Sequence, residues 1–160
     1  MTEERAIAVT VTLPPGRRFH EPVSPPTAGP DDDATMDLFA TPILVIEDEA
    51  IIAWLIEETL LEAGFRTVAI SATGDQAVAM AARRAPGIIV SDVNLGPGID
   101  GVEAIRAIRA GRAIPAIFVT GFANDTMTAR LEREMPGAKL LRKPVDGVEL
   151  VRCVMRLLAN

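Results

Sequence analysis

Four positions with charged or reactive side chains each follow a short run of apolar residues. In chain order they are the acidic pair Glu47-Asp48, then Asp92, Thr120 and Lys143. A carboxylate can attack phosphorus and hold the phosphoryl group as an acyl phosphate, but one anion must then approach another. A divalent cation reduces that repulsion and orients the oxygens. Acid, hydroxyl and cation together therefore indicate metal-assisted phosphoryl chemistry.

Mg²⁺ is the metal that suits this set of side chains. It is a hard, octahedral ion that takes one or two carboxylates together with waters. Asp48 and Asp92 can supply the carboxylates, with Glu47 acting through a water. Lys143 can then neutralise one phosphoryl oxygen, and the Thr120 hydroxyl can hydrogen-bond to another.

Each of these side chains also has an ordinary structural interpretation. An acid at the end of a strand, such as Asp92, is often a helix N-cap or a turn residue. Glu47-Asp48 can be solvated acids or a cap, Thr120 a capping hydroxyl, and Lys143 a surface cation. Only the combination of all four positions favours chemistry over these alternatives.

The elements that must position these residues follow a regular pattern from Pro42 onward. Short apolar runs alternate with helical patterns, which is typical of βαβ units and a parallel sheet. Strands are predicted near 43–47, 66–71, 87–91, 115–119 and 138–141. Helices are predicted near 50–63, 74–84, 100–110, 123–134 and 146–158. Right-handed crossovers place the carboxyl ends of all strands at one edge, where the four positions should converge.

Periodicity also predicts which side of each helix faces the core. The first helix should bury one apolar stripe, made of Ile52, Leu55, Ile56 and Leu60, and should end at Gly64. The last helix should bury a second stripe, made of Leu150, Val151, Val154, Leu157 and Leu158.

Composition limits the other classes of function. The net charge of the 160 residues is −6 and no basic patch stands out, so binding to nucleic acid or to a membrane surface is not expected. Aromatic residues make up only 4% of the chain, which argues against base stacking. A single cysteine, Cys153, excludes an internal disulfide and fits a cytoplasmic location. No signal peptide or membrane helix is expected.

Residues 1–40 differ from the rest of the chain. They are rich in proline, and seven acidic and three basic side chains give them a net charge of −4. We expect a disordered arm over 1–40 and one domain over 41–160, with a possible strand at residues 6–13. Met36 is an alternative start of translation.

The segment 42–159 resembles the receiver domain of bacterial two-component response regulators, of the chemotaxis-regulator (CheY-like) type. Spacings of 44, 28 and 23 residues separate Asp48, Asp92, Thr120 and Lys143, and they resemble those of the family. The matching motifs are Val45-Ile46-Glu47-Asp48-Glu49, Val90-Ser91-Asp92-Val93-Asn94-Leu95, Asp100-Gly101, Val119-Thr120-Gly121 and Arg142-Lys143-Pro144. The resemblance implies an α/β, three-layer, doubly wound (βα)5 flavodoxin-like fold with parallel strand order 2-1-3-4-5.

The resemblance also implies a role for each site residue. Asp92 is the phosphoacceptor, and Asp48 is a direct ligand of Mg²⁺. The backbone carbonyl of Asn94 completes the protein's share of the metal shell, with Glu47 contributing through a water. Thr120 and Gly121 are the switch and phosphoryl-binding positions, Lys143 is the phosphate-binding cation, and Pro144 is a candidate for a cis peptide bond.

Two features set this chain apart within the family pattern. Leu140 occupies the position on the last strand where receivers commonly carry an aromatic residue or histidine, so the usual coupling of hydroxyl and aromatic ring is not expected. Phe118-Val119-Thr120-Gly121-Phe122 resembles the Phe-Ala-Thr-Gly variant of receivers common in alphaproteobacteria.

The sequence therefore predicts a single-domain response regulator of a phosphorelay and not an enzyme, apart from possible slow self-dephosphorylation. The phosphoryl donor would be a sensor histidine kinase or a histidine phosphotransfer protein, and output would pass to an unknown downstream protein. The oligomeric state stays open. Two alternatives remain, a haloacid-dehalogenase-like phosphatase and a pseudo-receiver that binds partners without being phosphorylated.

Overall fold

The computed structural model describes residues 38–121 and 124–159. Several expectations concern residues outside these ranges and stay predictions. They are the arm, a strand at residues 6–13, a start at Met36 and the part of the variant motif at Phe122.

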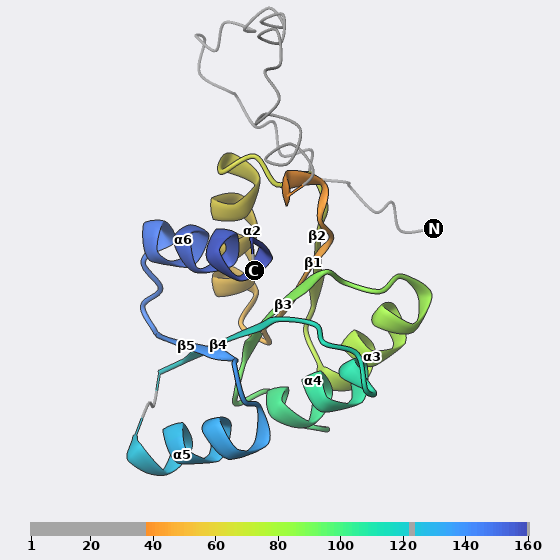
Figure 1. The fold of residues 1–160 in the computed structure, drawn as a ribbon, viewed down its shortest axis with the longest axis vertical. Coiled ribbons are helices and arrows are strands. Elements are labelled where there is room, and N and C mark those ends of the chain that lie inside the picture. The colour runs from red at the N-terminus through yellow and green to blue at the C-terminus, as the bar shows by residue number, and fades with distance from the viewer. Residues whose placement is uncertain (1–37, 122–123, 160) are drawn as a thin grey trace, which may run out of the picture.

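Strands and helices alternate along the described chain (Figure 1). The strands are β1 (Ile43–Ile46), β2 (Val68–Ser71), β3 (Ile88–Asp92), β4 (Ala116–Thr120) and β5 (Lys139–Arg142). The helices between and after them are α2 (Ala50–Glu62), α3 (Gly74–Arg83), α4 (Gly101–Arg109), α5 (Asp125–Glu134) and α6 (Gly147–Leu158). The predicted elements are all present, with ends that shift by up to two residues.

All strand pairs are parallel, and the strand order is β2-β1-β3-β4-β5. The predicted doubly wound fold and its strand order are therefore confirmed. The register pairs Ile46 of β1 with Ser91 of β3, and Asp92 of β3 with Val119 of β4. The residues that follow β1, β3 and β4 consequently meet at the carboxyl edge of the sheet.

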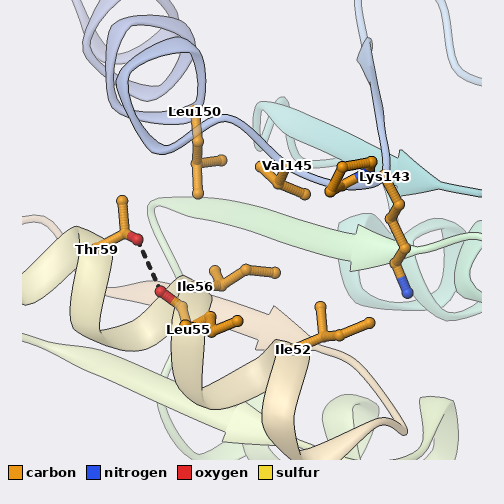
Figure 2. Close-up of a pocket in the computed structure, with 8 residues that line it drawn as sticks. Ile52, Leu55, Ile56, Thr59, Lys143, Val145 and Leu150 are labelled. Atoms are coloured by element: carbon orange, nitrogen blue, oxygen red, sulfur yellow. Dashed lines mark hydrogen bonds between the residues drawn. The ribbon is translucent and has the colours of Figure 1, made fainter.

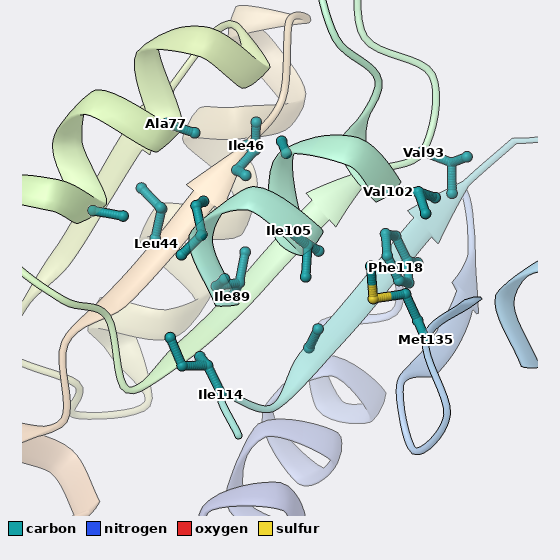
Figure 3. Close-up of a cluster of buried hydrophobic side chains, with 14 of the residues drawn as sticks. Leu44, Ile46, Ala77, Ile89, Val93, Val102, Ile105, Ile114, Phe118 and Met135 are labelled. Atoms are coloured by element: carbon teal, nitrogen blue, oxygen red, sulfur yellow. The ribbon is translucent and has the colours of Figure 1, made fainter. Parts of the chain in front are cut away.

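Helices cover both faces of the sheet, and each face buries its own apolar cluster (Figure 1). On one face α3, α4 and α5 pack over a cluster that includes Leu44, Ile89 and Phe118 (Figure 3). On the other face α2 and α6 pack over a cluster that includes Val45, Ile117 and Leu150. Because β1, β3 and β4 are buried on both sides, their sequences are apolar except for Ser91, Asp92 and Thr120 at the carboxyl ends.

One predicted helix stripe was wrong in part. Ile56 and Leu60 of α2 are buried, but Leu55 is 52% exposed and Ala53 takes its place against the sheet. The run from Ile51 to Ile56 is almost entirely apolar, so its periodicity did not fix the rotation of the helix. Gly64 follows the end of α2 with a positive φ of 104°, as expected for the residue after a C-cap.

The last helix follows its predicted stripe more closely. Leu150 and Val154 are buried, and Val151, Leu157 and Leu158 are half-buried. Among the described residues no helix combines the length and the apolar character needed to cross a bilayer.

Candidate functional site

Asp92 is the last residue of β3, and only 7% of its surface is exposed. Its Oδ2 accepts a hydrogen bond from Lys143 Nζ at 2.6 Å. Its Oδ1 accepts a hydrogen bond from the backbone N–H of Asn94 at 3.0 Å. The second contact is that of an ordinary turn-forming aspartate, whereas the first is a charge-assisted bond to a distant strand. A turn-forming role alone therefore does not explain this residue.

Lys143 follows β5 and connects three parts of the sheet edge. Its backbone N–H donates to the Thr120 carbonyl at 2.9 Å, which fixes the lysine beside the end of β4. Its Nζ also donates to Glu47 Oε1 at 2.9 Å and lies 3.7 Å from Glu49 Oε1. The side chain is only 14% exposed, so Lys143 is not a surface cation. Burial alone would lower its pKa, but the hydrogen bonds and charges of Asp92 and Glu47 outweigh burial and raise it.

Glu47 is buried directly after β1, with 2% of its surface exposed. Burial raises the pKa of Glu47, and the hydrogen bond and charge of Lys143 oppose this rise without cancelling it. The second carboxylate oxygen, Oε2, is buried and has no hydrogen-bond partner among the described residues. A buried oxygen without a partner is costly, so a cation or a water at this point would be favourable.

The donor set of this edge fits Mg²⁺. Glu47, Asp48 and Asp92 each offer one carboxylate oxygen, and these three oxygens lie within 4.8 Å of one another. Asp48 is exposed, whereas the other two acids are buried, so a cation can reach the cluster from the side of Asp48. Oxygen ligands at this spacing, with an orphaned carboxylate oxygen beside them, match a hard divalent ion.

The structure answers the capping interpretation for Glu49 and for Thr120. Glu49 is the N-cap residue of α2 but makes no capping hydrogen bond with its side chain. The N-cap of α5 is Asn124, whose side chain accepts from Met127, so Thr120 does not cap that helix. Thr120 is fully buried at the end of β4, and Gly121 after it is exposed.

Pro144 and Leu140 flank the site on β5 and beyond it. The Lys143–Pro144 peptide bond is cis. Leu140 is half-buried and packs against the cluster that contains Phe118 and Met135.

The loop from β3 to α4 is held at both ends. Asp100 forms a reciprocal capping box with Glu103, and its Oδ2 lies 3.0 Å from Arg130 of α5. Gly101 begins α4 and donates its N–H to the Val93 carbonyl at 3.0 Å. A Cβ atom at Gly101 would overlap the carbonyl oxygen of Asp92 and lie 2.6 Å from Ser91 Oγ. Sequence inspection singled out Asp100-Gly101 as a motif but did not reveal this close approach.

Gly101→Ala should therefore destabilise the domain by about 1–3 kcal/mol, the usual cost of forcing extra atoms into a packed site. Gly121→Ala is the matched control, because a Cβ there meets no atom within 4 Å. Urea unfolding of both variants would measure the difference. Equal stabilities of the two variants would contradict the close packing of α4 on Asp92.

A comparison with known families identifies this arrangement. The model of the response regulator receiver domain matches residues 43–155, from β1 into α6. The chain belongs to the response regulator receiver family. The expectation of a receiver domain, drawn from the motifs, is thereby confirmed, together with its parallel five-stranded fold.

Two curated proteins of the family resemble this receiver along most of its length. The phyllosphere-induced regulator PhyR of Methylorubrum extorquens is 33% identical over 131 residues, which cover 79% of this chain and 48% of PhyR. The transcriptional regulatory protein PdtaR of Mycobacterium tuberculosis is 30% identical over 128 residues, which cover 79% of this chain and 60% of PdtaR. The receiver thus spans about half to three fifths of the length of these relatives.

A solved receiver structure bears on the metal. The receiver domain of the sensor histidine kinase PA1611 from Pseudomonas aeruginosa is 34% identical, with a TM-score of 0.64. The match covers 76% of this chain and 99% of that domain, which has a magnesium ion coordinated in its active-site cleft. In this receiver Glu47, Asp48 and Asp92 form an acidic cluster at the edge of the sheet.

Proposed function

We propose that Asp92 accepts a phosphoryl group from a phosphohistidine on a sensor histidine kinase or a histidine phosphotransfer protein. The observation that carries this proposal is the contact of Asp92 Oδ2 with Lys143 Nζ at 2.6 Å, within a cluster of three carboxylates. Lys143 holds Asp92 at the open edge of the sheet and keeps a positive charge beside the oxygen that would react. The proposal includes a cytoplasmic location, which the single cysteine supports.

The transfer is a displacement at phosphorus. An Asp92 carboxylate oxygen forms a bond to phosphorus while the bond from phosphorus to the imidazole nitrogen of the donor breaks, and the electron pair of that bond returns to the imidazole. Lys143 then neutralises one phosphoryl oxygen. The Thr120 hydroxyl and the N–H of Gly121 are the proposed donors to the remaining oxygens, because they follow the neighbouring strand.

Glu47, Asp48, Asp92 and the carbonyl of Asn94 are the proposed holders of Mg²⁺. When bound, the ion supplies charge neutralisation between the carboxylates and the incoming phosphoryl group. Asp48 would contribute as a direct ligand because it is the exposed member of the cluster. Glu47 would contribute through a water, which would also satisfy its orphaned Oε2.

Asp48→Asn should weaken Mg²⁺ binding. Loss of a partner outside the direct ligand shell typically costs about 10–100-fold in metal affinity, so loss of a direct carboxylate ligand should cost at least as much. Isothermal titration calorimetry with MgCl₂ would measure the affinity, with Asp125→Asn as an exposed aspartate control. Equal affinities for the wild type and Asp48→Asn would remove Asp48 from the proposed metal site.

The surface beside Lys143 supports a protein as the phosphoryl donor. A pocket of about 160 Å³ opens between α2 and the segment that joins β5 to α6 (Figure 2). Apart from Lys143 and Thr59 its lining is apolar, namely Ile52, Leu55, Ile56, Pro144, Val145 and Leu150. Of these lining residues Leu55 is 52% exposed. We assign this apolar surface to the phosphohistidine partner, which must approach Asp92 from the same edge.

Phosphorylation is expected to act on the face formed by α5, β5 and α6, where a downstream protein would bind. The added charge biases an equilibrium between two arrangements of this face. With Leu140 in place of an aromatic residue, the proposed bias passes through Thr120 and the loop after β4, without a ring that changes position.

Phosphorylation by acetyl phosphate with Mg²⁺ separates this proposal from its two rivals. A shifted band on a Phos-tag gel that is absent when EDTA replaces Mg²⁺ in the reaction supports the receiver. No shift favours a phosphorylation-independent binding module. Rapid turnover of a generic phosphate ester favours a phosphatase, although that class uses a second Asp two residues after the nucleophile, where this chain has Asn94. Pull-down with and without beryllofluoride would then find the downstream protein.

A further inference from the structure

The two edges of the sheet differ in their chemistry. The outer strand β5 carries the exposed charges Lys139 and Arg142, which discourage pairing with another strand. The opposite outer strand, β2, has the sequence VAIS, and three of its four residues are half-exposed. An uncharged, partly exposed apolar edge of this kind favours the addition of a further strand.

The backbone of β2 has groups available for such a strand. The carbonyls of Thr67 and Ser71 accept hydrogen bonds from β1. Because backbone groups alternate in direction along a strand, those of Val68 and Ile70 point away from β1. Among the described residues no strand pairs with this side of β2.

One flank of α2 extends this edge into an apolar surface. Thr59 lies against Gly147 of α6, since a Cβ on Gly147 would be 3.0 Å from Thr59 Cγ2. Trp54 and Leu61 lie roughly 140–160° around the helix axis from Thr59 and therefore face the β2 side of the sheet. They are 55% and 41% exposed. Val68 and Ile70 of β2 pack on the same face of the sheet as α2. We call Trp54, Leu61, Val68 and Ile70 the β2-edge surface.

We infer that residues 6–13 of this chain add to β2 as a sixth strand and cover the β2-edge surface. This segment alternates with a period of two, and Ile7, Val9, Val11 and Leu13 form its larger apolar face. Neither residues 6–13 nor β2 contains a charged side chain. The larger face of the segment would pack beneath Trp54 and Leu61, and its alanine and threonine face would lie on the side of α3.

The attachment of the arm favours the same chain over a second copy. The arm joins the described residues at Leu38, and the carbonyl of Phe39 accepts a hydrogen bond from the N–H of Arg66 at 3.0 Å, just before β2. Residues 14–37 would serve as the tether, and at about 3 Å per residue for a proline-rich chain their 24 residues can reach well beyond the length of β2, about 13 Å. Attachment to the same chain keeps residues 6–13 near β2 at any protein concentration, which favours them over a second copy in dilute solution.

Trp54 is the sole tryptophan of the chain and reports directly on this surface. In the full-length protein, Val9→Asp should shift Trp54 emission to longer wavelength and increase its quenching by acrylamide. Val23→Asp is the matched control, since it introduces the same change in the arm outside residues 6–13, and it should leave Trp54 unchanged. The amides of Val68 and Ile70 should exchange with deuterium about tenfold faster in Val9→Asp than in the control.

Identical Trp54 emission and amide exchange in the wild type and Val9→Asp would overturn the inference. A difference that appears only at high protein concentration, together with a dimer by light scattering, would assign residues 6–13 to a second copy and would also overturn it. The inference is independent of the phosphoryl chemistry, because neither variant alters a residue of the proposed site.

Discussion

Asp92→Asn should abolish phosphorylation by acetyl phosphate, even at saturating Mg²⁺. The substitution keeps the shape of the side chain and replaces the oxygen that contacts Lys143 with an amide group, which cannot attack phosphorus. The Phos-tag shift of the wild-type protein measures the loss. We expect the shifted band to disappear and not merely to weaken, since no other carboxylate of the cluster is the last residue of a buried strand with Lys143 beside it.

Asp125→Asn is the control for this result. Asp125 lies exposed in the first turn of α5, outside the carboxylate cluster. The Asp125→Asn protein should be phosphorylated to the same extent as the wild type. A persistent shifted band in Asp92→Asn would mean that another residue is the acceptor.

Lys143→Ala should have the largest effect on stability, a loss of about 3 kcal/mol, which is typical when one partner of a buried ion pair is removed. Lys143 Nζ contacts both Glu47 and Asp92. Removal of this lysine therefore leaves two buried carboxylates without a counter-charge. Urea unfolding in EDTA would measure the loss without interference from added metal.

Two further variants decide whether the buried charge is the cause. Lys139→Ala removes an exposed lysine from β5, the strand just before Lys143, and should change stability by no more than about 0.5 kcal/mol. In the double variant Lys143→Ala with Glu47→Gln, part of the lost stability should return because one buried charge is gone. If the double variant is no more stable than Lys143→Ala, the lost stability comes from packing of the lysine side chain and not from the unpaired charge.

The fold and the place of the site could be predicted because they depend on local pattern. Apolar runs such as Ile43–Ile46 and residues 116–119 are buried on both faces, and a polar residue directly after such a run must lie at the carboxyl edge of a parallel sheet. That rule located Glu47-Asp48, Asp92, Thr120 and Lys143 before any contact was known.

Features that depend on three-dimensional packing could not be predicted. The contacts of Lys143 with Glu47 and Asp92 join residues 96 and 51 positions apart. The rotation of α2, which exposes Leu55 and buries Ala53, follows from packing against the sheet and α6. The approach of Gly101 to Asp92 depends on how closely α4 begins after the loop. In each case the residue types permitted several arrangements, and the tertiary contacts selected one.

The two flanks of α2 have different proposed roles in this receiver. Ile52 and Leu55 line the pocket next to Lys143, where the phosphohistidine partner would bind. Trp54 and Leu61 face the edge of β2, where residues 6–13 would add as a strand. The two surfaces can be tested separately, because they share no residue.

The most direct test of the proposed phosphoacceptor is to locate the phosphoryl group itself. The wild-type protein would be treated with acetyl phosphate and Mg²⁺, the acyl phosphate trapped with borohydride, and the modified peptide sequenced by mass spectrometry. A single modification at Asp92, absent when EDTA replaces Mg²⁺, is the expected result. An unmodified protein, or a modification at a residue other than Asp92, would contradict it.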